Sequence, residues 1–151
     1  MLGSLYYGFL VRPYSKNVAK SLRKEAKWYC SDWSTVTDPG QRAETFVACQ
    51  LLKAVELWSD IGLGSYELYY LRNKQKREVD FLVVRGKKPW FMVEVELSDT
   101  NRSPRLEYYQ KQVSAPHAFQ AVVNMDYIHS DCFKREDPCV VPAKTLSSQL
   151  C

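Results

Sequence analysis

The sequence predicts a mixed α/β (α+β) fold in which helices flank a central sheet. Between two helical patterns, the stretch 69–97 contains three short runs of β-branched and aromatic residues, at 69–72, 78–84 and 90–97. These runs predict a three-stranded meander. A further run at 119–124 follows the second helical pattern. Because strands joined by a helical crossover pair in parallel, the order helix, meander, helix, strand predicts a mixed sheet.

The segment before the first helix has a different character. Residues 2–14 are aromatic and apolar and are predicted to pack on this domain or on a neighbouring one. Residues 15–27 have helical spacing with the lysines and arginines outside, and residues 28–30 indicate a short strand. We divide the chain into three parts. Residues 1–35 form an N-terminal segment that is helical, winged-helix-like or part of an interface. Residues 36–128 form the core, and residues 129–151 form a tail that packs on the core.

Both helices have start signals. Asp38 can cap the first helix, and Gln41 three residues later completes a capping-box pattern. The helix should end near residue 59, before two glycines. Glu44 lies one helical turn before the apolar stripe and on the same side of the helix, which predicts that it faces the buried side. The alternative interpretation is that Glu44 has only a structural role, in which the helix dipole favours a negative charge near the N-terminus. A serine–proline pair at 103–104 starts the second helix.

Composition limits the classes of protein that fit. The 151 residues carry a formal net charge of +4, and the five cysteines form no C-x-x-C pair. Free thiols in odd number fit a reducing compartment, and no apolar run is long enough to cross a membrane. We therefore expect a cytoplasmic protein. The sequence contains neither a Walker-type nucleotide motif nor the G-x-S-x-G motif of a nucleophilic triad.

Carboxylates alternate along two of the predicted strands. Alternation places Glu78 and Asp80 on one face of their strand. Val79, Phe81 and Val83 then lie on the opposite face. On the next strand Glu94 and Glu96 share a face. Three or four carboxylates could thus meet, and like charges so close need a cation, which predicts a site for a hard divalent metal. An ordinary solvated strand face is the alternative.

Basic residues cluster in the turns beside these strands. Cations there would draw a phosphodiester backbone toward the carboxylates, whereas a solvated charged face is the alternative. The predicted nucleic-acid-binding residues are Arg72, Lys74, Lys76, Arg77, Lys87 and Lys88.

The arrangement of the acids resembles a known superfamily. A helical glutamate, a strand aspartate and an E-x-E on the next strand are similar to the PD-(D/E)XK nucleases, which implies a restriction-endonuclease-like core. More narrowly, the chain resembles domain of unknown function 4143, which commonly forms the C-terminal part of prokaryotic AAA-type ATPases. The resemblance covers about residues 5–150 and rests on Lys27-x-Tyr29-x-x-Asp32, Gly40-x-x-x-Glu44, Tyr69-Tyr70-Leu71-Arg72-Asn73, Glu78-Val79-Asp80-Phe81-Leu82 and Val93-Glu94-Val95.

The resemblance implies a site and a reaction. Its catalytic residues would be Glu44, Asp80, Glu94 and Glu96. A magnesium or manganese ion would be held by Asp80, Glu94, Glu44 and the carbonyl of Val95. The ion would polarise a phosphodiester and activate water for its hydrolysis.

One departure from the superfamily pattern separates two functions. Glu96 occupies the position of the lysine in E-x-K, and glutamate supplies no positive charge. Lys111 and Lys53 are candidates to take its place. The first function is a degenerate nuclease-like domain that binds nucleic acid or protein beside an ATPase module, in cis or in trans. The second is an active endonuclease that hydrolyses DNA with magnesium or manganese.

Overall fold

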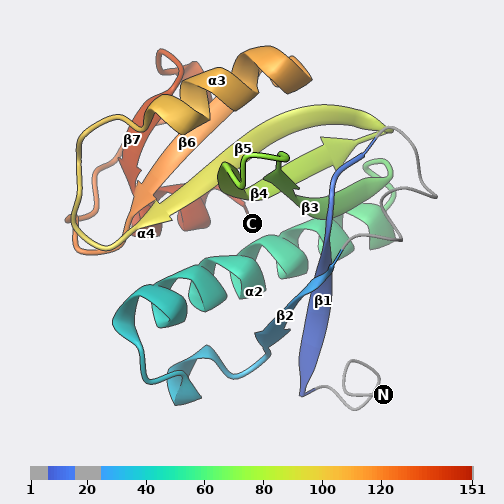
Figure 1. The fold of residues 1–151 in the computed structure, drawn as a ribbon, viewed down its shortest axis with the longest axis horizontal. Helices are drawn as coiled ribbons and strands as arrows, with labels where there is room; N and C mark the ends of the chain where they lie inside the picture. Colours follow the sequence, from blue (N-terminus) through green and yellow to red (C-terminus); the bar gives the residue numbers. More distant parts are fainter. Residues whose placement is uncertain (1–6, 16–24, 151) are drawn as a thin grey trace.

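A seven-stranded mixed sheet forms the centre of the molecule in the computed structural model, which describes residues 7–15 and 25–150 (Figure 1). The strands are β1 (Gly8–Pro13), β2 (Lys27–Cys30), β3 (Tyr66–Arg72), β4 (Glu78–Arg85), β5 (Lys88–Glu96), β6 (His117–Val122) and β7 (Cys139–Pro142). The helices are α2 (Pro39–Asp60), α3 (Pro104–Val113) and α4 (Ala143–Ser148), with 3₁₀ turns η2 (Trp33–Thr35) and η3 (Cys132–Lys134).

The strand order is β2-β1-β3-β4-β5-β6-β7. Strands β3, β4 and β5 form the predicted antiparallel meander. Helix α3 then crosses over to β6, which pairs in parallel with β5 as predicted, and β7 pairs in parallel with β6. The prediction of a mixed α/β fold with a mixed sheet is confirmed.

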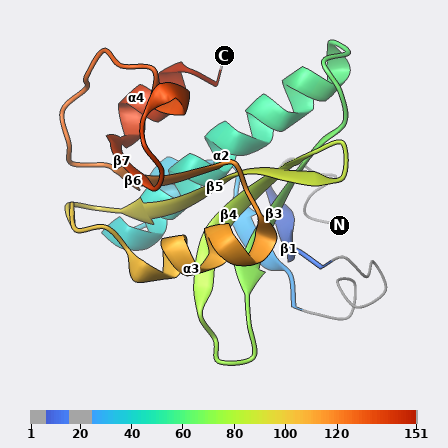
Figure 2. The same cartoon turned by 90° about the horizontal axis from the view of Figure 1, so that it is seen from above.

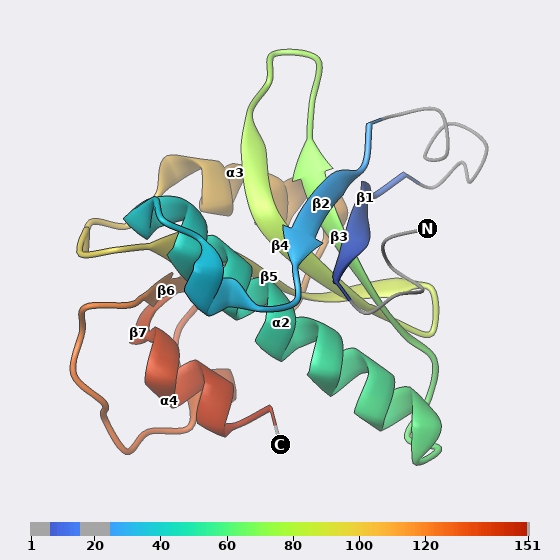
Figure 3. The ribbon, with the colours of Figure 1, turned by 90° about the horizontal axis from the view of Figure 1, so that it is seen from below.

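The helices lie on both faces of the sheet. Helices α2 and α4 cover one face, and α3 covers the other (Figures 1 and 3). The predicted cap is present, because the backbone N–H of Gln41 donates to Oδ2 of Asp38 over 2.8 Å. The larger core packs α2 and α4 against the sheet, and a smaller one lies under α3. Among the helices of the described chain, none combines the length and apolar character needed to cross a membrane.

The N-terminal strands extend the sheet beyond β3. Strands β1 and β2 form an antiparallel hairpin, and β1 pairs in parallel with β3. The ring of Trp28 covers Gly8 closely, since a Cβ at this position would lie 2.3 Å from it. The predicted strand at 28–30 is confirmed as β2, whereas most of the helix predicted for 15–27 falls outside the described residues.

Candidate functional site

The acidic residues lie where β4 and β5 separate. The two strands pair from Arg85↔Lys88 to Phe81↔Val93, and Asp80 and Glu94 are the next residue on each strand. Beyond this point β5 continues alongside β6. Oδ2 of Asp80 accepts a hydrogen bond of 2.8 Å from the backbone N–H of Val95. The carboxylate of Asp80 thus accepts a backbone N–H that a carbonyl of the neighbouring strand would otherwise accept. We call this point, where β4 and β5 separate, the fork.

The side chains of β4 do not alternate throughout the strand, which corrects the sequence analysis. Val79 packs in the core under α3 with Leu82 and Val84, although alternation places it with Phe81 and Val83, which face α2. A register shift in the neighbouring strand β3, between Tyr69 and Leu71, accompanies the change. Because the alternation is interrupted, the end of β4 that carries the acids is turned toward Lys27 and Glu44.

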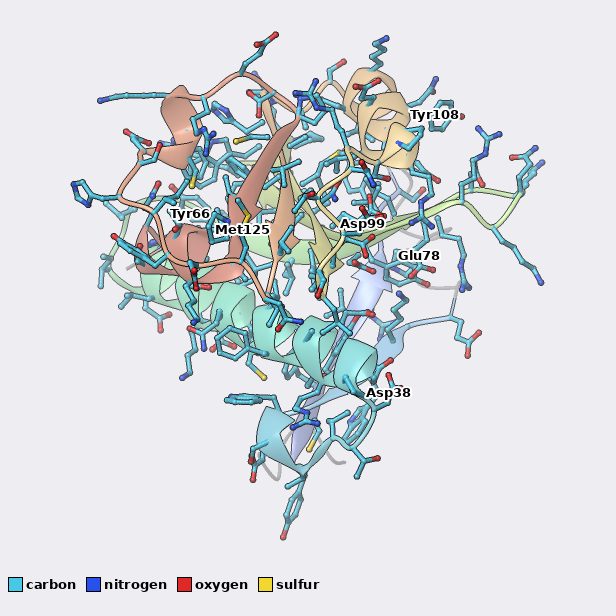
Figure 4. The ribbon with its side chains drawn as sticks, turned by 90° about the vertical axis from the view of Figure 1, so that its left-hand side faces the viewer. Asp38, Tyr66, Glu78, Asp99, Tyr108 and Met125 are labelled. Atoms are coloured by element: carbon cyan, nitrogen blue, oxygen red, sulfur yellow. The ribbon has the colours of Figure 1, made fainter. Side chains whose placement is uncertain are left out.

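Lys27 links two of the carboxylates on the α2 side. Its Nζ forms an ion pair with Oε1 of Glu78 and lies 3.7 Å from Oε1 of Glu44. The hydroxyl of Tyr29 also donates to Oε1 of Glu44 over 2.6 Å, and Nε of Arg72 lies 3.1 Å from Oε2 of Glu78. Figure 4 shows Glu78 near the base of the β3–β4 hairpin.

The charge of Lys27 is maintained by these acids. Burial lowers the pKa of Lys27, but its hydrogen bond to Glu78 and the charges of Glu44, Glu78 and Asp80 raise the pKa above its ordinary value overall. Lys27 is therefore a permanent cation at neutral pH. Burial and the charge of Glu44 raise the pKa of Tyr29, which keeps its hydroxyl protonated as a donor.

Glu94 is held from the opposite face of the sheet. Its side chain is 3% exposed, and Oε1 accepts a hydrogen bond of 2.6 Å from Nη2 of Arg105 on α3. Oε2 is buried and has no hydrogen-bond partner within the part of the chain that the structure describes. A buried carboxylate needs a compensating charge, and Arg105 is the cation that supplies it.

Asp80 and Glu96 both have a raised pKa. Burial, followed by the charge of Glu44, raises the pKa of Asp80 to about 7, against the opposing effects of the N–H of Val95 and the charge of Lys27. Burial and the charges of Glu94 and Asp99 raise the pKa of Glu96. The fold thus favours the protonated form of Asp80.

The fork brings together part of the predicted site. The charges of Glu44 and Glu94 both act on Asp80, and the N–H of Val95 donates to Asp80. Glu96 lies further along β5, where Glu94 and Asp99 act on it. Among the described residues, no group of three or more His, Cys, Asp or Glu side chains is placed to hold a metal ion.

A polar cavity of about 450 Å³ opens beside the acids on the α2 side. Lys27, Tyr29, Glu44, Tyr70 and Arg72 are among the residues that line it. Both signs of charge therefore face the cavity.

The predicted nucleic-acid-binding residues form two separate groups. Arg72, Lys74, Lys76 and Arg77 belong to the β3–β4 hairpin, near Glu78, whereas Lys87 and Lys88 belong to the β4–β5 turn at the other end of β4. An eight-residue strand spans about 26 Å. The two groups therefore do not surround the acids together.

The cations beside the carboxylates are not those proposed to replace the E-x-K lysine. The charge of Lys53 acts on the thiol of Cys49, and Lys111 lines a different cavity, with Asp137. Lys27 and Arg105 contact the acids instead. Lys27 stands in one of the motifs on which the family resemblance rests, but Arg105 is one of several charged residues on α3 and has no distinguishing signal in the sequence.

Fold and site define a mixed α/β domain with carboxylates where two strands diverge, three of which lie beside cations of the chain. The sequence profile of "Domain of unknown function (DUF4143)" matches residues 39–145, well over half of the chain. The chain belongs to this family. No curated protein and no solved structure shows significant similarity to it.

Proposed function

We propose that this chain is a nuclease-like accessory domain of an AAA-type ATPase, and that it binds nucleic acid without cleaving it. The observation that carries the proposal is the internal neutralisation of the acids. Lys27 pairs with Glu78 and lies near Glu44, and Arg105 pairs with Glu94. Two of the carboxylates that the resemblance assigns to a metal ion, Glu44 and Glu94, thus already lie beside cations of the chain.

The order of elements supports the restriction-endonuclease-like part of the proposal. The glutamate on α2, the aspartate on β4 and the glutamate on β5 precede α3 and β6 in the chain, which is the order that the superfamily resemblance implies. Glu96 at the E-x-K lysine position supports the loss of cleavage, because this acid cannot stabilise negative charge that develops on a phosphate. The partner ATPase module follows from the family resemblance.

The exposed basic hairpin supports nucleic acid as the partner. Lys74 and Lys76 are exposed, and neither forms an ion pair within residues 7–15 and 25–150. Phosphate contacts from lysine and arginine supply most of the affinity of sequence-independent nucleic-acid binding.

A metal-dependent endonuclease is the second candidate, favoured by Oε2 of Glu94. This buried oxygen lacks a partner in the described structure, and the neighbouring Asp80 has a raised pKa. Magnesium is often held by one or two carboxylates and several waters, so Asp80 and Glu94 are the residues that would hold one such ion. When bound, the ion would supply a Lewis acid and an activated water.

Manganese binding separates the two candidates. We expect calorimetric titration of the chain with MnCl₂ at pH 7.5 to show no saturable binding, because Lys27 already lies near Glu44 and Arg105 already pairs with Glu94. We also expect duplex DNA to bind in EDTA and supercoiled plasmid to remain intact in Mn²⁺. Saturable Mn²⁺ binding and plasmid nicking that are both lost in Asp80→Asn and Glu94→Gln would establish the endonuclease instead.

A further inference from the structure

The hairpin between β3 and β4 is a basic projection from the body of the domain. It extends beyond the sheet in three views (Figures 2, 3 and 4). Its last strand pair is Arg72↔Glu78, and residues 74–77 at the tip are all exposed. The tip sequence Lys74-Gln75-Lys76-Arg77 contains three cations and no acid.

Hydrogen bonds within the loop fix the shape of the tip. The N–H of Asn73 donates to the carbonyl of Arg77 over 3.1 Å, and the N–H of Lys76 donates to the carbonyl of Asn73 over 3.0 Å. The N–H of Arg77 donates to Oδ1 of Asn73 over 2.9 Å. Lys76 adopts a left-handed conformation, with φ of 60°. The loop is therefore a defined turn whose lysine side chains extend from a fixed backbone.

The base of the hairpin is anchored to the body on two sides. Arg72 pairs with Glu78, which also binds Lys27 from β2. On the other side, the hydroxyl of Tyr109 on α3 donates to the carbonyl of Arg77 over 2.8 Å. The hairpin is thus held out from the domain in one direction, which lowers the entropic cost of presenting it to a partner.

We propose that the β3–β4 hairpin inserts into the major groove of duplex DNA, with Lys74 and Lys76 at the phosphates that line the groove. The inference rests on the proposed function and names its substrate class. The major groove of B-form DNA is about 12 Å wide and 8.5 Å deep and admits a two-stranded ribbon. Three residues of extended chain reach about 10 Å, which matches the depth. Double-stranded RNA has a deep, narrow major groove that excludes such a ribbon.

The chain contains a matched control for this surface. Each of the turns 73–77 and 86–88 contains two exposed lysines, and in each turn one lysine has a positive φ, 60° for Lys76 and 66° for Lys87. The variants Lys74→Gln/Lys76→Gln and Lys87→Gln/Lys88→Gln therefore remove the same charge from similar backbone at opposite ends of β4.

Fluorescence anisotropy over a salt series tests the proposal with duplex DNA, single-stranded DNA and duplex RNA of one sequence. Each phosphate contact contributes about 0.9 to the slope of log K against log salt. We expect Lys74→Gln/Lys76→Gln to lower the slope for duplex DNA by about 1.8 and the low-salt affinity at least tenfold. The control variant should change affinity less than threefold, and duplex RNA should bind at least tenfold more weakly than duplex DNA.

Two results would overturn the inference alone: equal losses in the two variants, or equal binding of duplex DNA and duplex RNA. Absence of binding to all three polymers at low salt would overturn the nucleic-acid part of the proposed function as well. Circular dichroism of both variants, compared with the unaltered chain, shows whether a loss of binding comes from the removed charges or from a change of fold.

Discussion

Replacing Asp80 with asparagine is expected to stabilise the folded chain at pH 8 by up to about 4 kcal/mol. Burial and Glu44 raise the pKa of Asp80 from 3.8 to about 7 in the fold. The fold therefore favours the protonated side chain. This contribution to stability is fully present below pH 3.8 and is lost as the pH rises to about 7. Asparagine stays neutral and can still accept the N–H of Val95.

The measurement is urea unfolding of the unaltered chain and of the Asp80→Asn variant at pH 4 and pH 8. The two stabilities should be similar at pH 4 and should separate at pH 8, where only the unaltered chain contains the ionised side chain. Asp126→Asn serves as the control, because Asp126 is exposed in a loop and its replacement should change stability by less than about 0.5 kcal/mol. A loss of stability in Asp80→Asn at pH 8 would contradict the assignment.

Replacing Arg105 with alanine is expected to lower the free energy of unfolding by about 2 kcal/mol at pH 8, because Arg105 is half exposed but its partner Glu94 is buried. The substitution leaves Glu94, which is 3% exposed, as a buried charge without its cation. Adding Glu94→Gln to the same chain should recover much of the loss, because an amide needs no counter-charge. Urea unfolding of the two single variants and the double variant gives the coupling energy directly.

Arg102, in the loop that precedes α3, supplies the matched control. Its ion pair with Glu107 measures 3.9 Å, and both side chains are about half exposed. Such a pair contributes no more than about 1 kcal/mol, so Arg102→Ala should be nearly neutral. Similar losses of stability in Arg102→Ala and Arg105→Ala would show that the ion pair with Glu94 contributes no more to stability than an exposed ion pair.

Local patterns in the sequence predicted most of the fold. The cap at Asp38 and the apolar period of α2 depend only on neighbouring residues, and so do the three runs of the meander. The interruption at Val79 depends on the register of β3 against β4, which no pattern within β4 contains. The separation of Lys87 from Lys76 follows from an antiparallel meander, in which successive turns lie at opposite ends of the sheet.

The sequence predicted the elements that carry the acids of the candidate site but not the cations that lie beside them. Spacing placed Glu44, Asp80 and Glu94 correctly on a helix and two adjacent strands. Their counter-charges come from elements distant in sequence: Lys27 is 51 residues from Glu78, and Arg105 is 11 residues from Glu94. Ion pairing of this kind is set by tertiary packing, so a charged residue on a helix surface does not reveal its partner.

The β1–β2 hairpin affects how this domain should be dissected. The family match begins at residue 39, but Lys27 and Tyr29 lie on β2, before that boundary. A chain trimmed to the matched region would leave the edge of β3 unpaired, which favours self-association. It would also remove Lys27 from Glu44 and Glu78. Metal binding by such a fragment would then come from carboxylates that trimming had exposed, and not from a site of the whole domain.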